Sequence, residues 1–246
     1  MLAKPPPTEA ELKAELSALS WKRFEIVLDG EHIEVIDRER EMVRLGSSAG
    51  DMKELMPDAI DRGVEALGRF RQVAGIHGAE VRAVATSAVR EATNRAEFIT
   101  RARDEAGIDV EVISGFEEAR LIHLGVLATV PSYHDQLLVF DIGGGSTEVV
   151  VGHGADILYA RSLKLGSIRM TLRYFDGDKV TSKAVKACRE DIRATLTPAV
   201  RQARQLGFDI AVASSGTAGA VFQMIAAGHD GPAPRNLGNL RVTRDE

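Results

Sequence analysis

The sequence predicts an α/β fold, and three features of the 246-residue chain carry that prediction. Strand-like and helix-like segments alternate through the first half, which favours helices layered on a sheet. Residues 137–152, LLVFDIGGGSTEVVVG, are two apolar runs joined by a glycine-rich turn, which is the pattern of a β-hairpin. A further apolar run over 157–163 extends the hairpin into a predicted three-stranded meander.

The segments before residue 50 are short. Three consecutive prolines predict an extended lead over residues 1–8, and helical composition predicts a helix over 9–19. Asp29-Gly30 is a typical hairpin turn. The strands expected around this turn are 24–28, 32–36 and an edge strand over 37–44, before a loop at 46–50.

Between residues 57 and 129 the expected helices and strands alternate. The helices follow from apolar residues at helical spacing, with Asn94 as a helix cap and Gly107 as a stop. The strands are short apolar runs bounded by turn residues. In chain order we expect a helix over 57–74, a strand over 81–85, a helix over 94–106, a strand over 110–113 and a helix over 117–129.

The second half is expected to begin after a polar connector at 131–136. The meander is followed by a turn into a helix at 164–167. An amphipathic pattern then predicts a long helix over 183–206, in which Pro198 removes a backbone donor and predicts a kink. The remaining predicted elements are a strand over 210–213, a helix over 218–227 and an irregular tail over 228–246.

Composition argues against several classes of function. The net charge of −5 and pI near 5.8 imply no general attraction to nucleic acid. A single cysteine, Cys188, rules out an internal disulfide framework and predicts a reducing, cytoplasmic environment. No apolar run reaches the roughly 18 residues that cross a membrane, and the N-terminus lacks the pattern of a signal peptide. The histidines show no metal-ligand spacing, so neither a zinc site nor a Ser/His/Asp triad is indicated.

The glycine-rich turn carries an acid on each side, Asp141 before it and Glu148 after it. Glycines let backbone N–H groups approach an anion closely, and the two hydroxyls add donors. Paired carboxylates beside a phosphate cradle suit a Mg²⁺ ion that is bound together with phosphate oxygens. A tight hairpin without a ligand is the alternative, although such a turn does not need three glycines. The turn residues are Gly143, Gly144, Gly145, Ser146 and Thr147.

Three further segments outside the glycine-rich turn are weaker candidates for a functional site. SGFEEAR places Glu117 and Glu118 at a helix start, where the macrodipole favours acids whether or not they are catalytic. Arg90 follows a strand end and offers a fork of donors for phosphate, or is an ordinary surface arginine. A strand-to-helix junction can bind anions through backbone amides, but many junctions share its composition. The junction residues are Ser214, Ser215, Gly216 and Thr217.

Taken together, five motifs closely resemble the exopolyphosphatase/guanosine pentaphosphate phosphohydrolase (Ppx/GppA) family over residues 24–227. In chain order they are ATSAVREATN, ISGFEEARLIHLG, DIGGGSTEVV, SLKLGS and SSGT. The resemblance implies an actin-like (ribonuclease H-like) α/β fold with two domains and a cleft between them. It implies domain I over 21–130 and a shortened domain II over 131–246, after an atypical N-terminal extension over 1–20.

The resemblance also implies roles for individual residues. Glu118 resembles the general base that activates water. Asp141 and Glu148 resemble the acids that hold Mg²⁺ and orient the water, and Arg90 resembles a phosphate clamp. The expected phosphate loop is Gly143, Gly144, Gly145, Ser146 and Thr147, and the expected junction loop of the second domain is Ser215, Gly216 and Thr217.

The function implied is release of terminal phosphate from inorganic polyphosphate, with guanosine pentaphosphate as the alternative substrate and a homodimer left open. One departure favours a weakly active or inactive binding relative instead. The family's first phosphate loop, Asp-x-Gly-x-Asn, does not occur before Trp21, where EAELKAELSALSW stands. Losing such a loop is expected to cost several kcal/mol of transition-state stabilisation, by analogy with about 3 kcal/mol for one oxyanion donor. An actin-fold ATPase or sugar kinase is least favoured, because SGFEEAR resembles the phosphatase branch.

Overall fold

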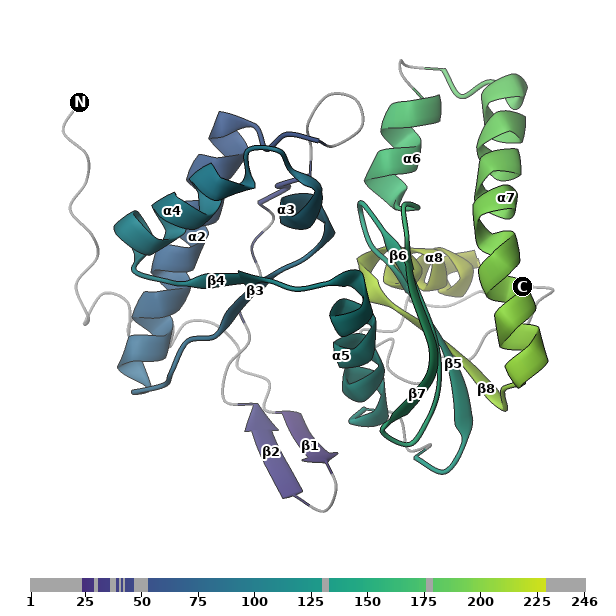
Figure 1. The fold of residues 1–246 in the computed structure, drawn as a ribbon, viewed down its shortest axis with the longest axis horizontal. Coiled ribbons are helices and arrows are strands. Elements are labelled where there is room, and N and C mark those ends of the chain that lie inside the picture. Colours follow the sequence, from purple (N-terminus) through teal and green to yellow (C-terminus); the bar gives the residue numbers. More distant parts are fainter. Residues whose placement is uncertain are drawn as a thin grey trace.

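The structure is a computed structural model that describes residues 24–28, 31–35, 39, 41, 43–46, 53–129, 133–175 and 179–228. The predicted lead and helix before residue 20, the Asp29-Gly30 turn and the tail after Gly228 lie outside these residues. Figure 1 shows two groups of elements. One surrounds the short strands β3 (Ala83–Ala85) and β4 (Val110–Val112), and the other surrounds a four-stranded sheet.

The N-terminal hairpin is confirmed, with β1 (Phe24–Leu28) paired antiparallel to β2 (Glu31–Val35). The edge strand predicted over 37–44 is wrong at the residues described there, since 39, 41, 43 and 44 belong to no strand. Helix side chains hold this segment instead. The Arg62 Nε group donates to the Val43 carbonyl at 3.2 Å, and Arg69 pairs with Glu41.

The first group packs around one apolar core. Its helices are α2 (Pro57–Ile76), α3 (Ser87–Glu91) and α4 (Arg95–Ala106), and β3 runs parallel to β4. A Cβ on Gly63 of α2 would lie 2.9 Å from Phe98 of α4, so the glycine lets the two helices approach closely. The core residues include Leu55, Ile60, Val64, Val89 and Phe98.

Asn94 occupies the position before α4, but its side chain does not cap the helix, so that prediction is wrong. Its Oδ1 accepts from the Leu55 amide at 2.9 Å, and its Nδ2 donates to the Leu55 carbonyl at 2.9 Å. An amide side chain has both a donor and an acceptor, so it can pair with a backbone unit as a neighbouring strand does. Asn94 therefore ties α4 to the segment before α2.

The larger group contains the predicted meander, which the structure confirms. Strands β5 (Gln136–Ile142), β6 (Thr147–His153) and β7 (Asp156–Leu163) are antiparallel neighbours. Strand β8 (Ile210–Ser214) pairs parallel to β5, which gives the order β7-β6-β5-β8. A parallel pair needs a long crossover, and helices α6 (Ser167–Tyr174) and α7 (Ser182–Leu206) supply it.

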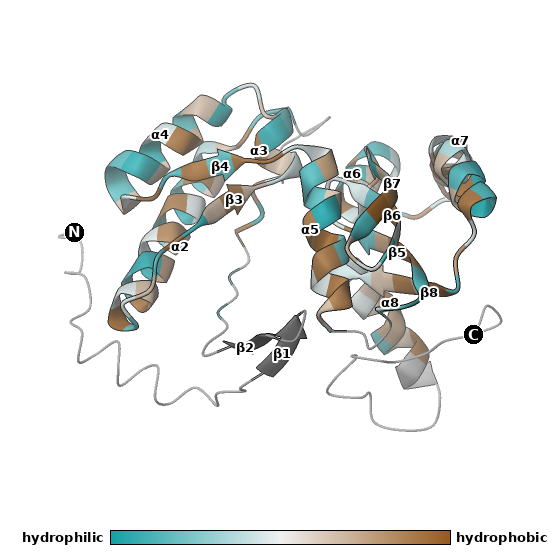
Figure 2. Cartoon of the chain, turned by 60° about the horizontal axis from the view of Figure 1, so that its bottom comes forward, coloured by the Kyte–Doolittle hydropathy of each residue, from teal (hydrophilic) through white to brown (hydrophobic). Residues whose placement is uncertain are grey.

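The sheet is covered on both faces. Leu137 and Val139 of β5 pack under α5 (Gly115–Leu127), whereas Leu138 packs with Ala199 and Ala203 of α7. This alternation is the period-two pattern of a strand buried on both sides. Helix α7 continues through Pro198, and α8 (Ser215–Gly228) follows β8. Figure 2 shows the hydrophobic colouring on α5 beside the sheet.

Helix α5 joins the two groups. It follows β4 of the first group in the chain, yet its apolar side packs on the four-stranded sheet (Figure 1). The start of α5 is therefore placed where the two groups meet. The domain boundaries at residues 20 and 130 stay a prediction. None of the described helices has the length and apolar character needed to cross a membrane.

Candidate active site

The glycine-rich turn between β5 and β6 places Asp141 directly opposite Glu148 on paired strands. The Gly143 amide donates to the Ser146 carbonyl at 2.9 Å, which closes the turn. The two acids of the motif therefore stand side by side at one end of the sheet, and the glycines project beyond them.

The carbonyl groups of the three glycines in the turn are held by the first turn of α6. Gly143 accepts from the Ser167 amide at 3.0 Å, and Gly144 accepts from the Arg169 amide at 3.0 Å. Gly145 accepts from the Arg169 Nε group at 2.7 Å. Within the described part of the chain, the amides of Gly144 and Gly145 donate to no backbone carbonyl. Carbonyls held on one side and amides left on the other are the arrangement of an anion-binding turn.

The turn and the start of α6 touch through their backbones, which explains two of the glycines. A Cβ on Gly144 would lie 2.8 Å from Ile168 Cδ1. A Cβ on Gly166 would overlap the carbonyl of Gly144. Gly166 therefore requires a residue without a side chain, because the overlap there is with backbone, whereas at Gly144 the contact is with the flexible end of Ile168.

Glu148 is a buried carboxylate, with 1% of its surface exposed. Burial raises its pKa, and the nearby carboxylates of Glu118 and Asp141 raise it further, while a hydrogen bond from Ser162 opposes the shift. Burial also raises the pKa of Asp141, against a hydrogen bond from Ser214. Three acids from distant parts of the sequence therefore lie within electrostatic range of one another.

Glu118 reaches this group from the first turn of α5. A Cβ on Gly115 would lie 2.6 Å from Ser162 Cβ, so the start of α5 is pressed against β7 beside Glu148. The Arg90 Nη1 group donates to Glu118 Oε2 at 2.9 Å and to the Ile113 carbonyl at 3.0 Å. Arg90 therefore fixes the direction of the Glu118 carboxylate.

The neighbouring acid, Glu117, faces a different partner. Its carboxylate accepts two hydrogen bonds from Arg120, at 2.7 and 2.8 Å, and both side chains are substantially exposed. Its amide donates to Ser114 Oγ at 3.1 Å, which caps α5. The two consecutive acids thus separate, one toward the acidic group and the other toward the surface.

The junction between β8 and α8 lies against the glycine turn. Ser215 Oγ donates to the Ile142 carbonyl, and Thr217 Oγ1 lies 3.2 Å from Ser167 Oγ. Ser215 has a φ of +81°, in a region that non-glycine residues rarely adopt. Such strained positions cluster at functional sites, where the surrounding structure holds them. Gly216 lies between these two hydroxyl residues in the junction.

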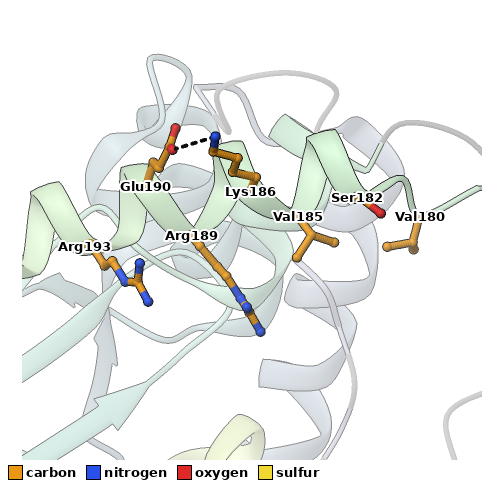
Figure 3. Close-up of a pocket in the computed structure, with 7 residues that line it drawn as sticks. All are labelled: Val180, Ser182, Val185, Lys186, Arg189, Glu190 and Arg193. Carbon is orange, nitrogen blue, oxygen red and sulfur yellow. Dashed lines mark ion pairs between the residues drawn. The ribbon is translucent and has the colours of Figure 1, made fainter.

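Two surface hollows lie along one face of α7 and share Arg193, with volumes of about 410 and 670 Å³. Figure 3 shows the first, with Arg189 and Arg193 extending from the helix on the same side. Neither hollow is lined by Glu118, Asp141 or Glu148. The candidate site is therefore defined by its acids and its turn, not by these hollows.

Comparison with known proteins identifies the family. The model of the Ppx/GppA phosphatase family matches residues 26–244. The chain belongs to the Ppx/GppA phosphatase family. It is 36% identical over 200 residues to a guanosine-5'-triphosphate,3'-diphosphate pyrophosphatase of Photobacterium profundum. The aligned region covers 80% of this chain and 40% of that relative.

Solved structures agree with the family assignment. An exopolyphosphatase from Cytophaga hutchinsonii superposes with a TM-score of 0.74 at 29% identity, over 84% of this chain and 66% of the other. A Ppx/GppA family member from Aquifex aeolicus gives 0.63 at 28% identity, over 85% of this chain and 66% of the other. The predicted actin-like α/β fold is confirmed. This Ppx/GppA chain spans less than two thirds of the length of these relatives.

The resemblance to the Ppx/GppA family implies a Mg²⁺ ion, and the two carboxylates of Asp141 and Glu148 are donors of the kind that Mg²⁺ binds. Among the described residues, no group of three or more His, Cys, Asp or Glu is arranged to hold a metal ion. Mg²⁺ does not require one, because it commonly binds one or two carboxylates and completes its shell with water and substrate phosphate. Asp141 and Glu148 offer two adjacent carboxylates. Their pKa values are raised in the metal-free chain, and a bound cation would lower them by favouring the charged forms.

Sequence reasoning missed Ser162 and Arg169 of this candidate site, and it placed Ser214 in the junction without its bond to Asp141. Ser162 and Ser214 bond the two acids from neighbouring strands, and Arg169 holds the Gly145 carbonyl. The strand register could have indicated the serines, because Ser162 pairs with Glu148 and Ser214 with Asp141. No sequence signal indicated Arg169, which lies 24 residues from Gly145.

Proposed function

We propose that the chain carries the catalytic centre of a Mg²⁺-dependent hydrolase that releases the terminal phosphate of inorganic polyphosphate. Membership of the Ppx/GppA phosphatase family supports a phosphoanhydride hydrolase. The observation that carries the proposal is the convergence of three acids: Asp141 and Glu148 are partners on β5 and β6, and the start of α5 brings Glu118 against β7 beside Glu148. The Glu118 carboxylate raises the pKa of Glu148, in agreement with this arrangement. Acids that influence one another in this way are typical of catalytic centres.

The terminal phosphate is bound in this proposal by the amides of the glycine turn and by Arg90. The Arg90 guanidinium has five N–H donors, and its Nη1 group serves Glu118 and Ile113. The remaining donors are the ones assigned to phosphate oxygens. Ser146 and Thr147 follow the glycines, and the Ser215–Thr217 junction lies beside them.

Glu118 is the proposed general base. It accepts a proton from water as the water oxygen bonds to the terminal phosphorus. The bond from that phosphorus to the bridging oxygen breaks, and the bridging oxygen leaves on the shortened chain. Asp141 and Glu148 would hold Mg²⁺, which supplies charge neutralisation at the phosphate oxygens. Phosphoryl transfer depends mainly on such positioning and neutralisation, and these residues supply both.

Guanosine pentaphosphate is the second candidate substrate. It is favoured by the 36% identity to a relative whose name describes action on guanosine-5'-triphosphate,3'-diphosphate. Both substrates end in a phosphoanhydride, so the same residues would act on either. A non-catalytic polyphosphate-binding relative is the third hypothesis, because residues 1–20 do not contain the motif Asp-x-Gly-x-Asn.

Phosphate release from long-chain polyphosphate with Mg²⁺ tests the proposal. Glu118→Gln is expected to lower kcat at least ~100-fold, the usual contribution of a general base. Glu117→Gln is the matched control, because Glu117 is the adjacent acid and pairs with Arg120 instead. Equal release by wild type and Glu118→Gln contradicts the assignment. If neither releases phosphate while both bind polyphosphate, the non-catalytic reading replaces it, and a parallel assay with guanosine pentaphosphate ranks the substrates.

A further inference from the structure

Helix α3 sends two consecutive side chains to two different parts of the candidate site. Arg90 pairs with Glu118 at the start of α5, at 2.9 Å. Glu91 pairs with Arg169 at the start of α6, where Arg169 Nη2 lies 3.2 Å from each carboxylate oxygen. One short helix therefore contacts both the proposed base and the segment that holds the glycine turn.

Arg169 connects this helix to the turn itself. Its Nε group donates to the Gly145 carbonyl at 2.7 Å while its Nη2 group faces Glu91. Only 4% of the Arg169 side chain is exposed, and 17% of Glu91. A planar guanidinium can hold two acceptors at fixed angles, which a single ammonium cannot do.

Glu91 has two further partners. Ser87 Oγ lies 3.2 Å from Glu91 Oε1, and Lys164 Nζ lies 3.0 Å from Oε2. Burial alone would raise the pKa of Glu91, but Lys164 and Arg169 outweigh it and hold the pKa below its usual value. Lys164 is 73% exposed, so its pairing contributes little to stability.

A buried ion pair often stabilises a fold no better than apolar residues of the same shape would. The stabilisation of the fold therefore does not explain why charges are buried at this place. Their geometry offers an explanation, because Arg169 and Glu91 together link Gly145 to helix α3, where Glu91 directly follows Arg90.

We propose that Arg169 and Glu91 act as a positioning pair for the reaction. Arg169 holds the Gly145 carbonyl, so that the amides of the turn keep a fixed position relative to Arg90 and Glu118, and Glu91 fixes Arg169. This inference rests on the proposed function where it is tested by kcat for polyphosphate hydrolysis.

The test compares Arg169→Lys and Glu91→Gln with Lys164→Gln in the full chain. Lys164→Gln is the matched control, because Lys164 reaches the same carboxylate from the exposed side. Arg169→Lys keeps the charge and the backbone bond from residue 169 to Gly144, and removes the guanidinium that bonds both Gly145 and Glu91. We expect Arg169→Lys and Glu91→Gln to lower kcat for polyphosphate hydrolysis ~10- to 100-fold, as misplacement of about 1 Å can. Lys164→Gln should keep kcat within about twofold, since the Lys164 side chain is 73% exposed and its ion pair is screened by solvent.

Two further measurements separate positioning from general support. Thermal unfolding should leave each variant folded at the assay temperature, and the Glu91→Gln, Arg169→Lys double variant should lose no more activity than Arg169→Lys alone, because Glu91 acts through Arg169. Additive losses in kcat, or a lower Tm with unchanged kcat, overturn the proposal.

A readout without turnover separates this inference from the proposed function. In the ligand-free chain, amide NMR shifts of Gly144 and Gly145 should move in Arg169→Lys and Glu91→Gln and stay in place in Lys164→Gln. If wild type releases no phosphate yet these shifts move, the pair positions the turn and the proposed function fails. If wild type is active and the shifts stay in place, the positioning pair fails instead.

Discussion

Ser162 on β7 donates to the Oε1 atom of Glu148 on β6 at 2.7 Å, and the two residues are partners in the strand register. This bond is the second-largest influence on the pKa of Glu148, after burial, and the two oppose each other. The hydroxyl therefore favours the charged form of a carboxylate that burial would otherwise neutralise.

Removing this hydroxyl should change the pH dependence of activity. Ser162→Ala takes away the hydrogen bond to the charged form, so the pKa of Glu148 rises further. The acidic limb of the profile of kcat/KM against pH should shift to higher pH, with the alkaline limb unchanged. Thr197→Ala removes an exposed hydroxyl on α7 as a control and should leave the profile in place. An unshifted acidic limb in Ser162→Ala would show that Glu148 does not control it.

Burial of Glu148 also predicts a pH-dependent cost in stability. Its pKa is higher in the folded chain than in the unfolded chain, so the folded chain binds this proton more tightly. Charged Glu148 therefore destabilises the fold fully above its folded pKa, and the cost declines as the pH falls from that value to the unfolded pKa, where it disappears. Glu148→Gln should have the higher Tm at pH 8, and the difference should vanish at acidic pH.

The control for this measurement is Glu117→Gln. Its hydrogen bonds with Arg120 lower the pKa of Glu117, so removing that charge should not raise the Tm at any pH. A Glu148→Gln variant that is less stable than wild type at pH 8 would mean that hydrogen bonds or a cation stabilise the carboxylate there by more than its burial costs.

The backbone contact between the turn and α6 predicts a costly glycine substitution. Gly166→Ala places a Cβ on the Gly144 carbonyl, and the free energy of unfolding should fall by about 1–3 kcal/mol, the usual cost of overpacking. Gly68→Ala is the control, because no described atom lies within 4 Å of its Cβ position inside α2. The free energy of unfolding of Gly68→Ala should rise by about 0.5–1 kcal/mol, because alanine lowers the entropy of the unfolded chain. Urea unfolding measures both, and a neutral Gly166→Ala would refute the contact.

Magnesium and phosphate should bind together if the two acids and the turn form one site. Thermal unfolding with Mg²⁺ and tripolyphosphate should give a higher Tm than unfolding with either alone, as ligand linkage requires. Asp141→Asn should abolish the joint increment, because one of the two carboxylates is lost. Asp156→Asn, at the exposed start of β7, should keep it. An increment that survives in Asp141→Asn would place the metal elsewhere.

Local sequence patterns were sufficient to predict most of this fold. Apolar runs on either side of three glycines predicted β5, β6 and the turn, and the register then placed Asp141 opposite Glu148. The strand and helix order of the second half followed in the same way. These elements are specified by neighbours in sequence, which is why a pattern of period two or 3.6 identifies them.

Other features depend on partners that lie far apart in the sequence. Asn94 looked like a helix cap, but Leu55, 39 residues away, takes both ends of its amide. Helix α3 is only five residues long, too short to show a helical period. The pairing of Glu91 with Arg169 spans 78 residues, and nothing local in either segment indicates the other.

The hydrogen bonds from the first turn of α6 to Gly143, Gly144 and Gly145 make that helix and the turn one mechanical unit. A tilt of α6 against the sheet would be transmitted to all three carbonyls together, so the amides behind them could not respond independently. Residues on the outer side of α6, such as Leu172, could thus alter phosphate affinity without approaching a phosphate.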